Sequence, residues 1–289
     1  MVFAITEKDS IPVSAYRQFQ FHYSNDLLHN TDRYLTQVAL LKYIQPLKES
    51  GSQNEFALQQ NVYTPSDIFG DTIQKNDRPY TALLFGSFKR TTCFSSANFL
   101  WSGQINAGVI GKSALGEQMQ RGVHYAVNNS QPRGWQYQLS DAPFINAKLA
   151  ADKGLIVRKH IEYIIQVHGN MGTVFNDVSV AHSIRFHIRN SHFNYLNSAS
   201  IKSFRVSICM KNELKLVAYN GTLQGGIGSR NNTYILTQDQ ISPFVYYQQI
   251  DLYMVMGPVG ITLSESYITK EFKTGLTHQW STLVLSYIF

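Results

Sequence analysis

Apolar and polar residues alternate along most of this 289-residue chain. The clearest case is residues 184–189, in which three apolar side chains alternate with two arginines and a histidine. A period of two is typical of β-strands that bury one face. It predicts about twelve strands, which we place at residues 18–23, 34–46, 55–63, 80–90, 97–109, 144–151, 156–169, 174–189, 203–219, 243–256, 259–269 and 280–289.

The alternation breaks between Ala107 and Leu139, where the spacing predicts a short helix at about residues 113–128, with Ser113 as its N-cap. Helical spacing puts polar side chains on one face, namely Glu117, Gln120 or Arg121, and His124. The opposite face is expected to pack against the rest of the protein and carries Leu115, Met119, Val123 and Ala126. An acid, an amide and an imidazole on one helix face make this segment the first place to look for chemistry.

Two all-β architectures explain so many alternating strands. One is a soluble barrel or sandwich with an apolar core, and the other is a transmembrane barrel with an apolar outer face. Most predicted strands exceed ten residues, and a tilted strand needs about 9–11 residues to cross a bilayer. The predicted turns at 169–173 and 257–258 are short, whereas the connections at 64–79 and 113–141 are long, as in barrels with short periplasmic turns and long outer loops. We therefore expect a single-domain antiparallel transmembrane β-barrel over residues 1–289, with a short helix in an extracellular loop.

Composition narrows the chemistry only a little. Charged residues make up 15% of the chain, against about 25% in average soluble domains, and the net charge of +6 favours an anionic partner. The chain contains no Gly-rich phosphate loop, no Gly-x-Ser-x-Gly elbow and no stacked-aromatic module for nucleic acid. Cys93 and Cys209 are expected to be free thiols. The first residues do not form a secretory signal, so for an exported protein the signal is expected to have been removed.

Several short motifs, in one order over nearly the whole chain, resemble the lipid A 3′-O-deacylase family of Gram-negative outer membranes. They are Asn25-Asp26, Thr31-Asp32-Arg33-Tyr34-Leu35-Thr36, Tyr63-Thr64-Pro65-Ser66-Asp67, Asn76-Asp77-Arg78-Pro79-Tyr80, Gly108-Val109-Ile110-Gly111, Gly134-Trp135-Gln136 and Glu271-Phe272-Lys273-Thr274-Gly275. The final strand ends on Phe289, as in many bacterial outer-membrane proteins. The resemblance implies a twelve-stranded outer-membrane barrel whose active site lies between the barrel wall and a loop helix.

The resemblance also implies a reaction and its residues. The family hydrolyses the ester that holds the 3′ acyloxyacyl group on lipid A, with a calcium ion, so lipopolysaccharide is the expected substrate and no protein partner is evident. His124 matches the catalytic histidine, and Asn25, Asp26 and Thr36 match polar residues at the first two strands. Lys75 is the only lysine in the loop that carries a catalytic lysine in the family.

The residue chemistry agrees with this assignment. Ester hydrolysis without a Ser or Cys nucleophile needs a base to activate water, and histidine titrates in the right range. Calcium takes oxygen ligands, so Asp26 and Asn25 are the expected metal ligands. Two other functions stay open: a non-catalytic outer-membrane barrel that binds lipid or a small solute, and an outer-membrane phospholipase.

Overall fold

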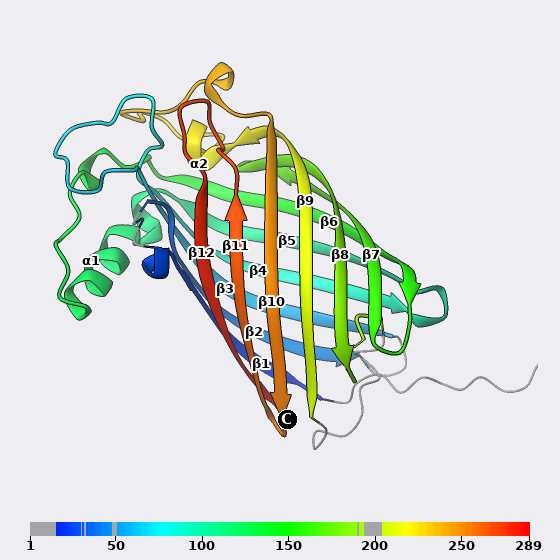
Figure 1. The fold of residues 1–289 in the computed structure, drawn as a ribbon. Coiled ribbons are helices and arrows are strands. Elements are labelled where there is room, and N and C mark those ends of the chain that lie inside the picture. The colour runs from blue at the N-terminus through cyan, green and yellow to red at the C-terminus, as the bar shows by residue number, and fades with distance from the viewer. Residues whose placement is uncertain (1–15, 30, 32, 48–50, 190, 194–203) are drawn as a thin grey trace, which may run out of the picture.

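Twelve antiparallel strands form a closed barrel in the computed structural model, which describes residues 16–29, 31, 33–47, 51–189, 191–193 and 204–289 (Figure 1). The strands are β1 (Gln18–Asn25), β2 (Tyr34–Leu47), β3 (Ser52–Thr64), β4 (Thr81–Phe94), β5 (Phe99–Ile110), β6 (Ala142–Val157), β7 (Ile161–Gly172), β8 (Phe175–Ile188), β9 (Arg205–Asn220), β10 (Phe244–Met256), β11 (Val259–Ile268) and β12 (His278–Ile288). Each strand pairs with its neighbour in sequence, and β1 pairs with β12 to close the sheet. Closure leaves no free sheet edge, as a barrel in lipid requires.

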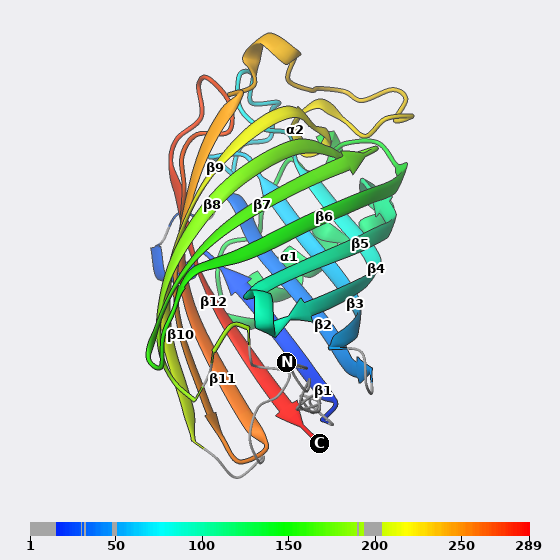
Figure 2. The same ribbon diagram turned by 90° about the vertical axis from the view of Figure 1, so that its right-hand side faces the viewer.

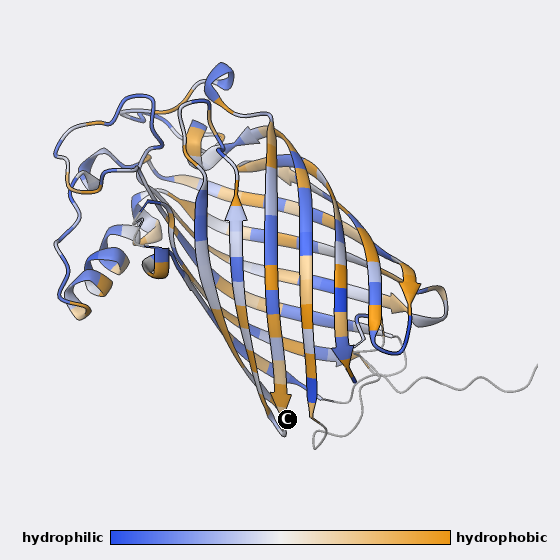
Figure 3. Ribbon diagram, in the orientation of Figure 1, coloured by the Kyte–Doolittle hydropathy of each residue, from blue (hydrophilic) through white to orange (hydrophobic). Residues whose placement is uncertain are grey.

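The predicted alternation separates the two faces of the wall. Leu149, Val180 and Leu214 are more than half exposed on the outside, whereas a cavity of about 820 Å³ inside the barrel is lined largely by polar side chains, including Lys148 and Asp152. Figure 3 shows the resulting bands of hydrophobic and hydrophilic residues along each strand. An outward lysine or arginine at mid-membrane would cost about 2–4 kcal/mol, so the charges gather in the lumen. The antiparallel barrel of about twelve strands predicted from the pattern is confirmed.

Some strand boundaries were predicted wrongly. Residues 152–155 were left between two predicted strands, yet they lie inside β6, which continues to Val157 through a bulge between Gly154 and Ile156. The expected turn at 169–173 is also displaced, because β7 runs to Gly172. Residues 173–174 then connect β7 to β8 at the end of the barrel that carries the long loops, not at the end with the short turns.

The helical content also differs from the expectation of one helix. Besides α1 (Gly116–Ala126), a second short helix, α2 (Gly221–Gln224), follows β9. Within the described ranges, no helix is both long enough and apolar enough to cross a membrane. Both cysteines are free, as expected. Residues 1–15, Asp32 and Ser203, which also figured in the sequence predictions, lie outside the described residues.

Strand tilt and loop length make the two ends of the barrel unlike (Figure 2). The β3–β4, β5–β6, β9–β10 and β11–β12 connections are long and share the end that we call the outer end. The described connections at the other end, β4–β5, β6–β7 and β10–β11, are short. The outer loops therefore supply most of the irregular structure from which a site can be built.

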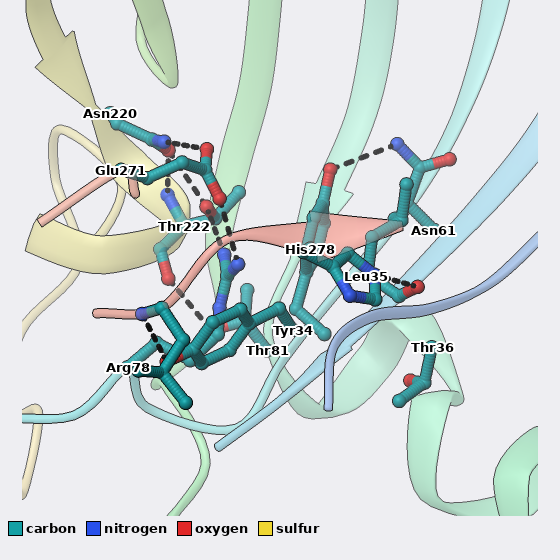
Figure 4. Close-up of polar contacts among 12 residues, drawn as sticks. Tyr34, Leu35, Thr36, Asn61, Arg78, Thr81, Asn220, Thr222, Glu271 and His278 are labelled. Atoms are coloured by element: carbon teal, nitrogen blue, oxygen red, sulfur yellow. Dashed lines mark hydrogen bonds and ion pairs between the residues drawn. The ribbon is translucent and has the colours of Figure 1, made fainter. Parts of the chain in front are cut away.

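A buried arginine ties three of these outer loops together (Figure 4). Arg78 is 1% exposed, and its Nη1 lies 3.1 Å from Glu271 Oε2 while its Nη2 donates to Thr222 Oγ1 at 2.9 Å. Its guanidinium also lies 4.5 Å from the centre of the Tyr63 ring. Asn220 Nδ2 donates to the other oxygen of Glu271 at 3.2 Å. Arg78, which follows β3 in sequence, thus fixes both the β9–β10 and the β11–β12 connections.

We expect Arg78→Met to destabilise the barrel by about 1.5–3 kcal/mol. The substitution removes the charged hydrogen bond to Glu271 and leaves that half-buried carboxylate without its cationic partner. Arg133→Met is the matched control, since Arg133 pairs with Asp71 at 3.4 Å on an exposed surface, where such a pair contributes at most about 1 kcal/mol. Denaturant unfolding followed by the electrophoretic shift of folded barrels measures both. Equal losses for the two variants would contradict the structural role of Arg78.

Candidate active site

The first candidate residues lie on the outer face of the barrel. On β1, Gln20 and Ser24 line the lumen cavity, whereas Phe19 and Phe21 are exposed to the outside. Because successive side chains point to opposite faces, Asn25 at the outer end of β1 belongs to the outer face. Its Nδ2 donates to the main-chain oxygen of Thr36 at 2.8 Å. The amide thus joins β1 to the start of β2.

Asp26 is buried and fixes the loop between β1 and β2. The side chain is 2% exposed, and Oδ2 accepts hydrogen bonds from Thr31 Oγ1 at 2.7 Å and from the Arg33 main-chain nitrogen at 3.0 Å. Carboxylates that accept main-chain hydrogen bonds in this way are typical of tight loops. The carboxylate is therefore held in place next to Asn25.

Thr36 connects this loop to β3. It lies where the β2–β3 register shifts between Leu35 and Gln37, and such a bulge redirects a side chain. Its Oγ1 donates to the main-chain oxygen of Val62 at 3.2 Å. The structure therefore brings Asn25, Asp26 and Thr36 together at the outer ends of β1 and β2, beside β3.

Helix α1 lies outside the barrel, against the wall formed by β3 and β4 (Figure 1). Gln60 Nε2 on β3 donates to the Ala114 main-chain oxygen at 2.6 Å. Gly116 makes the closest approach, since an added Cβ would lie 2.5 Å from Ala82 Cβ and 2.8 Å from the Trp135 ring. Only glycine allows this contact without a shift of the helix or the wall.

The start of the helix differs from the prediction. A short 3-10 turn spans Lys112–Ala114, and α1 begins only at Gly116, after Leu115 adopts a left-handed conformation with φ of 60°. Ser113 is not the N-cap, because its main-chain nitrogen and hydroxyl donate to Asp141 at 2.7 and 2.8 Å.

The buried face of α1 was also predicted wrongly. Gly116, Gln120 and His124 face the wall and are buried. The apolar residues expected to pack are exposed or half-buried, and these are Leu115, Met119, Val123 and Ala126. Glu117 pairs with Arg121 at 3.0 Å on the flank of the helix. The polar face can turn inward because Gln120 accepts a hydrogen bond from Trp135 and His124 contacts the Ser130 main-chain oxygen.

His124 is oriented by a main-chain contact. The residue is 5% exposed, and its Nδ1 lies 2.6 Å from the Ser130 main-chain oxygen. A carbonyl oxygen only accepts, so Nδ1 donates to it, and in the neutral imidazole the basic lone pair is then on Nε2. This tautomer is the one that a general base needs.

Gln120, one turn before His124, links the helix to the wall. Trp135 Nε1 donates to Gln120 Oε1 at 2.8 Å, and the Trp135 ring packs in a buried cluster with Val62 and Tyr80. Since Val62 also accepts the hydrogen bond from Thr36, the two halves of the site share one wall residue. In the described chain Gln120 Nε2 has no hydrogen-bond partner, which leaves a buried donor on the same helix face as His124.

Lys75 lies in the long loop between β3 and β4. It is exposed, and the adjacent Asn76 binds the loops of the barrel mouth: its main-chain nitrogen donates to Tyr234 Oη at 2.6 Å and its main-chain oxygen accepts from Thr274 Oγ1. These contacts connect Lys75 with the mouth, whereas His124 is held on the outer wall. Its assignment to the site stays a prediction.

The metal ligands also remain a prediction. Over the residues that the structure describes, no group of three or more His, Cys, Asp or Glu side chains forms a metal cluster. Asp26 contributes one carboxylate, and because Asn25 donates through Nδ2, its Oδ1 faces a different direction. An all-oxygen set of this kind fits calcium, which takes main-chain carbonyls and waters as further ligands.

Sequence reasoning did not find three residues that shape the site. Gln60, Val62 and Trp135 hold α1 and Thr36 against one stretch of wall. Trp135 stood within a recognised motif, but its role depends on a contact with the helix that precedes it. The outward register of β3 was the one available signal for Gln60 and Val62.

Comparison with known proteins identifies the family. The chain matches the family described as outer membrane protein LpxR over residues 2–289. It belongs to the LpxR family. This confirms the resemblance to the lipid A 3′-O-deacylases, the location in the outer membrane and a lipid A deacylase role.

One solved structure shows the same fold. LpxR from Salmonella typhimurium aligns with a TM-score of 0.82 at 18% identity, over 94% of this chain and 100% of that chain. A much weaker likeness, with a TM-score of 0.46 at 8% identity, is to the NanC porin, over 94% of this chain and 98% of that one. No curated protein sequence matches the chain significantly.

We expect Gly116→Ala to loosen α1 from the wall, because the new methyl group would collide with Ala82 and Trp135. Gly122→Ala is the matched control, since an added Cβ there meets nothing within 4 Å and alanine favours a helix by about 1 kcal/mol over glycine. Limited trypsin digestion of the folded barrel at Arg121 measures the difference. Faster cleavage of Gly116→Ala alone is expected, and unchanged cleavage would contradict the close contact.

Proposed function

We propose that this LpxR-family protein hydrolyses the ester that links the 3′ acyloxyacyl group to lipid A, with His124 as the general base. The observation that carries the proposal is the buried, oriented imidazole on the outer face of the wall. Its helix is linked to Thr36 through Gln120, Trp135 and Val62. A lipid ester in the outer leaflet can reach this face laterally. It does not have to enter the lumen.

The residues of the chain divide the work. Ser130 holds the Nδ1 proton of His124, so Nε2 takes a proton from water as that water attacks the ester carbonyl. The same nitrogen returns the proton to the leaving alkoxide. Trp135 fixes Gln120, which leaves the Gln120 amide as a donor on the reacting side of the helix. General base catalysis of this kind contributes about 10²–10⁴ in rate.

Calcium is part of the proposal. Asp26 and Asn25 would hold it, together with main-chain carbonyl oxygens and water. When bound, the ion would supply Lewis-acid stabilisation of the negative charge that develops on the ester oxygen. Lys75 is exposed at the outer end, and we assign it to a phosphate of the substrate because an ammonium group binds phosphate as a point charge.

A second candidate function rests on the lumen. The cavity of about 820 Å³ is lined by both acids and bases, which suits a small polar solute. This alternative makes the barrel a binding protein without catalysis. Release of fatty acid that depends on His124 separates the two functions.

We expect His124→Gln to lower deacylation of lipid A by about 10²-fold or more, because the base is lost. His160→Gln is the matched control, since His160 makes the same kind of Nδ1 contact, 3.1 Å to the His187 main-chain oxygen, at the opposite end of the barrel. Mass spectrometry of lipid A from cells that express each variant measures the product. Deacylation that survives in a folded His124→Gln barrel would refute the proposal.

Removal of calcium tests the metal separately. A chelator should abolish activity, and Asp26→Ala should lose activity that excess calcium partly restores, since a ligand has been removed and the others remain. Thr31→Val is the control, because it removes one hydrogen bond to the Asp26 carboxylate while the charge of that carboxylate remains. Fatty-acid release by purified protein measures each arm, and activity that the chelator leaves unchanged would exclude the calcium assignment.

A further inference from the structure

An apolar groove lies on the outer wall among β1, β2, β3 and β12. It measures about 790 Å³, and the atoms that face it are nearly all carbon. Its lining includes Phe19, Phe21, Leu41, Tyr43, Phe56 and Leu58, most of which are about half exposed. The aromatic rings of Phe19 and Tyr43 lie 5.0 Å apart at one end of it. In a barrel of the outer membrane, this surface faces the hydrocarbon region.

The strand register joins this groove to the candidate active site. Asn25 pairs with Gln37, and two residues further from the outer end Tyr23 pairs with Ala39. Ala39 in turn pairs with Gln60, the residue that anchors α1. The rows of the groove follow directly below, with Phe21 paired to Leu41 and Leu41 to Leu58, then Phe19 to Tyr43 and Tyr43 to Phe56.

The dimensions fit a lipid chain in one leaflet. At about 3.4 Å per residue, the lower row of the groove lies about 20 Å along β1 from Asn25. For a strand tilted by about 35–45° this is about 14–17 Å along the membrane normal. One leaflet of a hydrocarbon core of about 30 Å has a depth of about 15 Å. The upper row of the groove, at Phe21 and Leu41, lies about 14 Å along β1 from Asn25. The groove therefore lies below the site, within the depth occupied by acyl chains. Between the groove and the site lies Ala39, whose single methyl group stands between Tyr23 and Gln60 in the strand pairing.

We propose that this groove binds an acyl chain of the lipid substrate and thereby places its ester beside Asn25 and His124. The inference rests on the proposed function and specifies how the substrate is positioned. Lipid tails are as apolar as the wall, so burial from water gives no preference. The preference arises from van der Waals contacts on both sides of a chain in a concave surface, and from the alignment of the ester that these contacts produce.

Blocking the groove tests this assignment. Ala39→Trp places a ring between the groove and the site, and Leu58→Trp narrows the groove itself. Val180→Trp adds the same ring to an exposed position on β8 and serves as the control. Deacylation of long-chain lipid A by the two groove variants should fall roughly tenfold or more, while a short-chain ester analogue is cleaved at the normal rate. Groove variants that fold, by their electrophoretic shift, and match Val180→Trp on long chains would overturn the proposal. A wild-type protein that releases no fatty acid would instead contradict the proposed function.

A second measurement does not need turnover. Lipid A with a photoreactive group on its acyl chain is irradiated with the folded His124→Gln variant in vesicles, and labelled peptides are compared with those from a photoreactive phospholipid. We expect the lipid A probe to label β1–β3 more strongly than β7–β9. This difference should be larger than the one that the phospholipid probe gives. Even labelling around the barrel, equal labelling by both probes, or protein–protein cross-links at the groove would overturn the assignment.

Discussion

The close contact between α1 and the outer face of β3 and β4 is the interaction on which the candidate site depends. Gly116 brings the helix against Ala82 and Trp135, and Gln60 satisfies the Ala114 carbonyl, which would be costly to leave unpaired next to lipid. This contact buries Gln120 and His124 against the wall. The imidazole thereby shares a stretch of wall with Asn25 and Thr36 from the first two strands.

The alternation that forms the barrel wall also separates a charged inner face from an apolar outer face. Inward positions collect charges such as the ion pairs of Glu55 with Lys42 and Lys89, and outward positions carry the apolar belt. The candidate site and the groove below it occupy outward positions of β1, β2 and β3. A membrane lipid therefore meets the helix, the loop carboxylate and the groove on one face. The lumen, in contrast, stays a separate polar compartment, and Arg78 ties together the loops around its outer mouth.

Much of the fold could be predicted because a period of two assigns alternate residues to the lipid face and to the lumen of a barrel wall. The errors have local causes: residues 152–155 were left between two predicted strands, but Asp152 faces the lumen and accepts from Gln166. The buried face of α1 was predicted wrongly because the usual rule assumes water outside and an apolar core inside. Here the buried face meets Ala82 and the Trp135 ring, and the buried Gln120 accepts a hydrogen bond from that indole. Neither Trp135 nor Val62 could be assigned a role, since both act through contacts between distant segments.

The central claim is that the ester is cleaved on the outside of the barrel, between α1 and the ends of β1–β3. The most direct test is a crystal structure of the His124→Gln variant with lipid A and calcium. The account predicts the ester carbonyl beside Asn25 and residue 124, with an acyl chain along Leu41 and Leu58. Lipid density inside the lumen, or on another part of the wall, would contradict it.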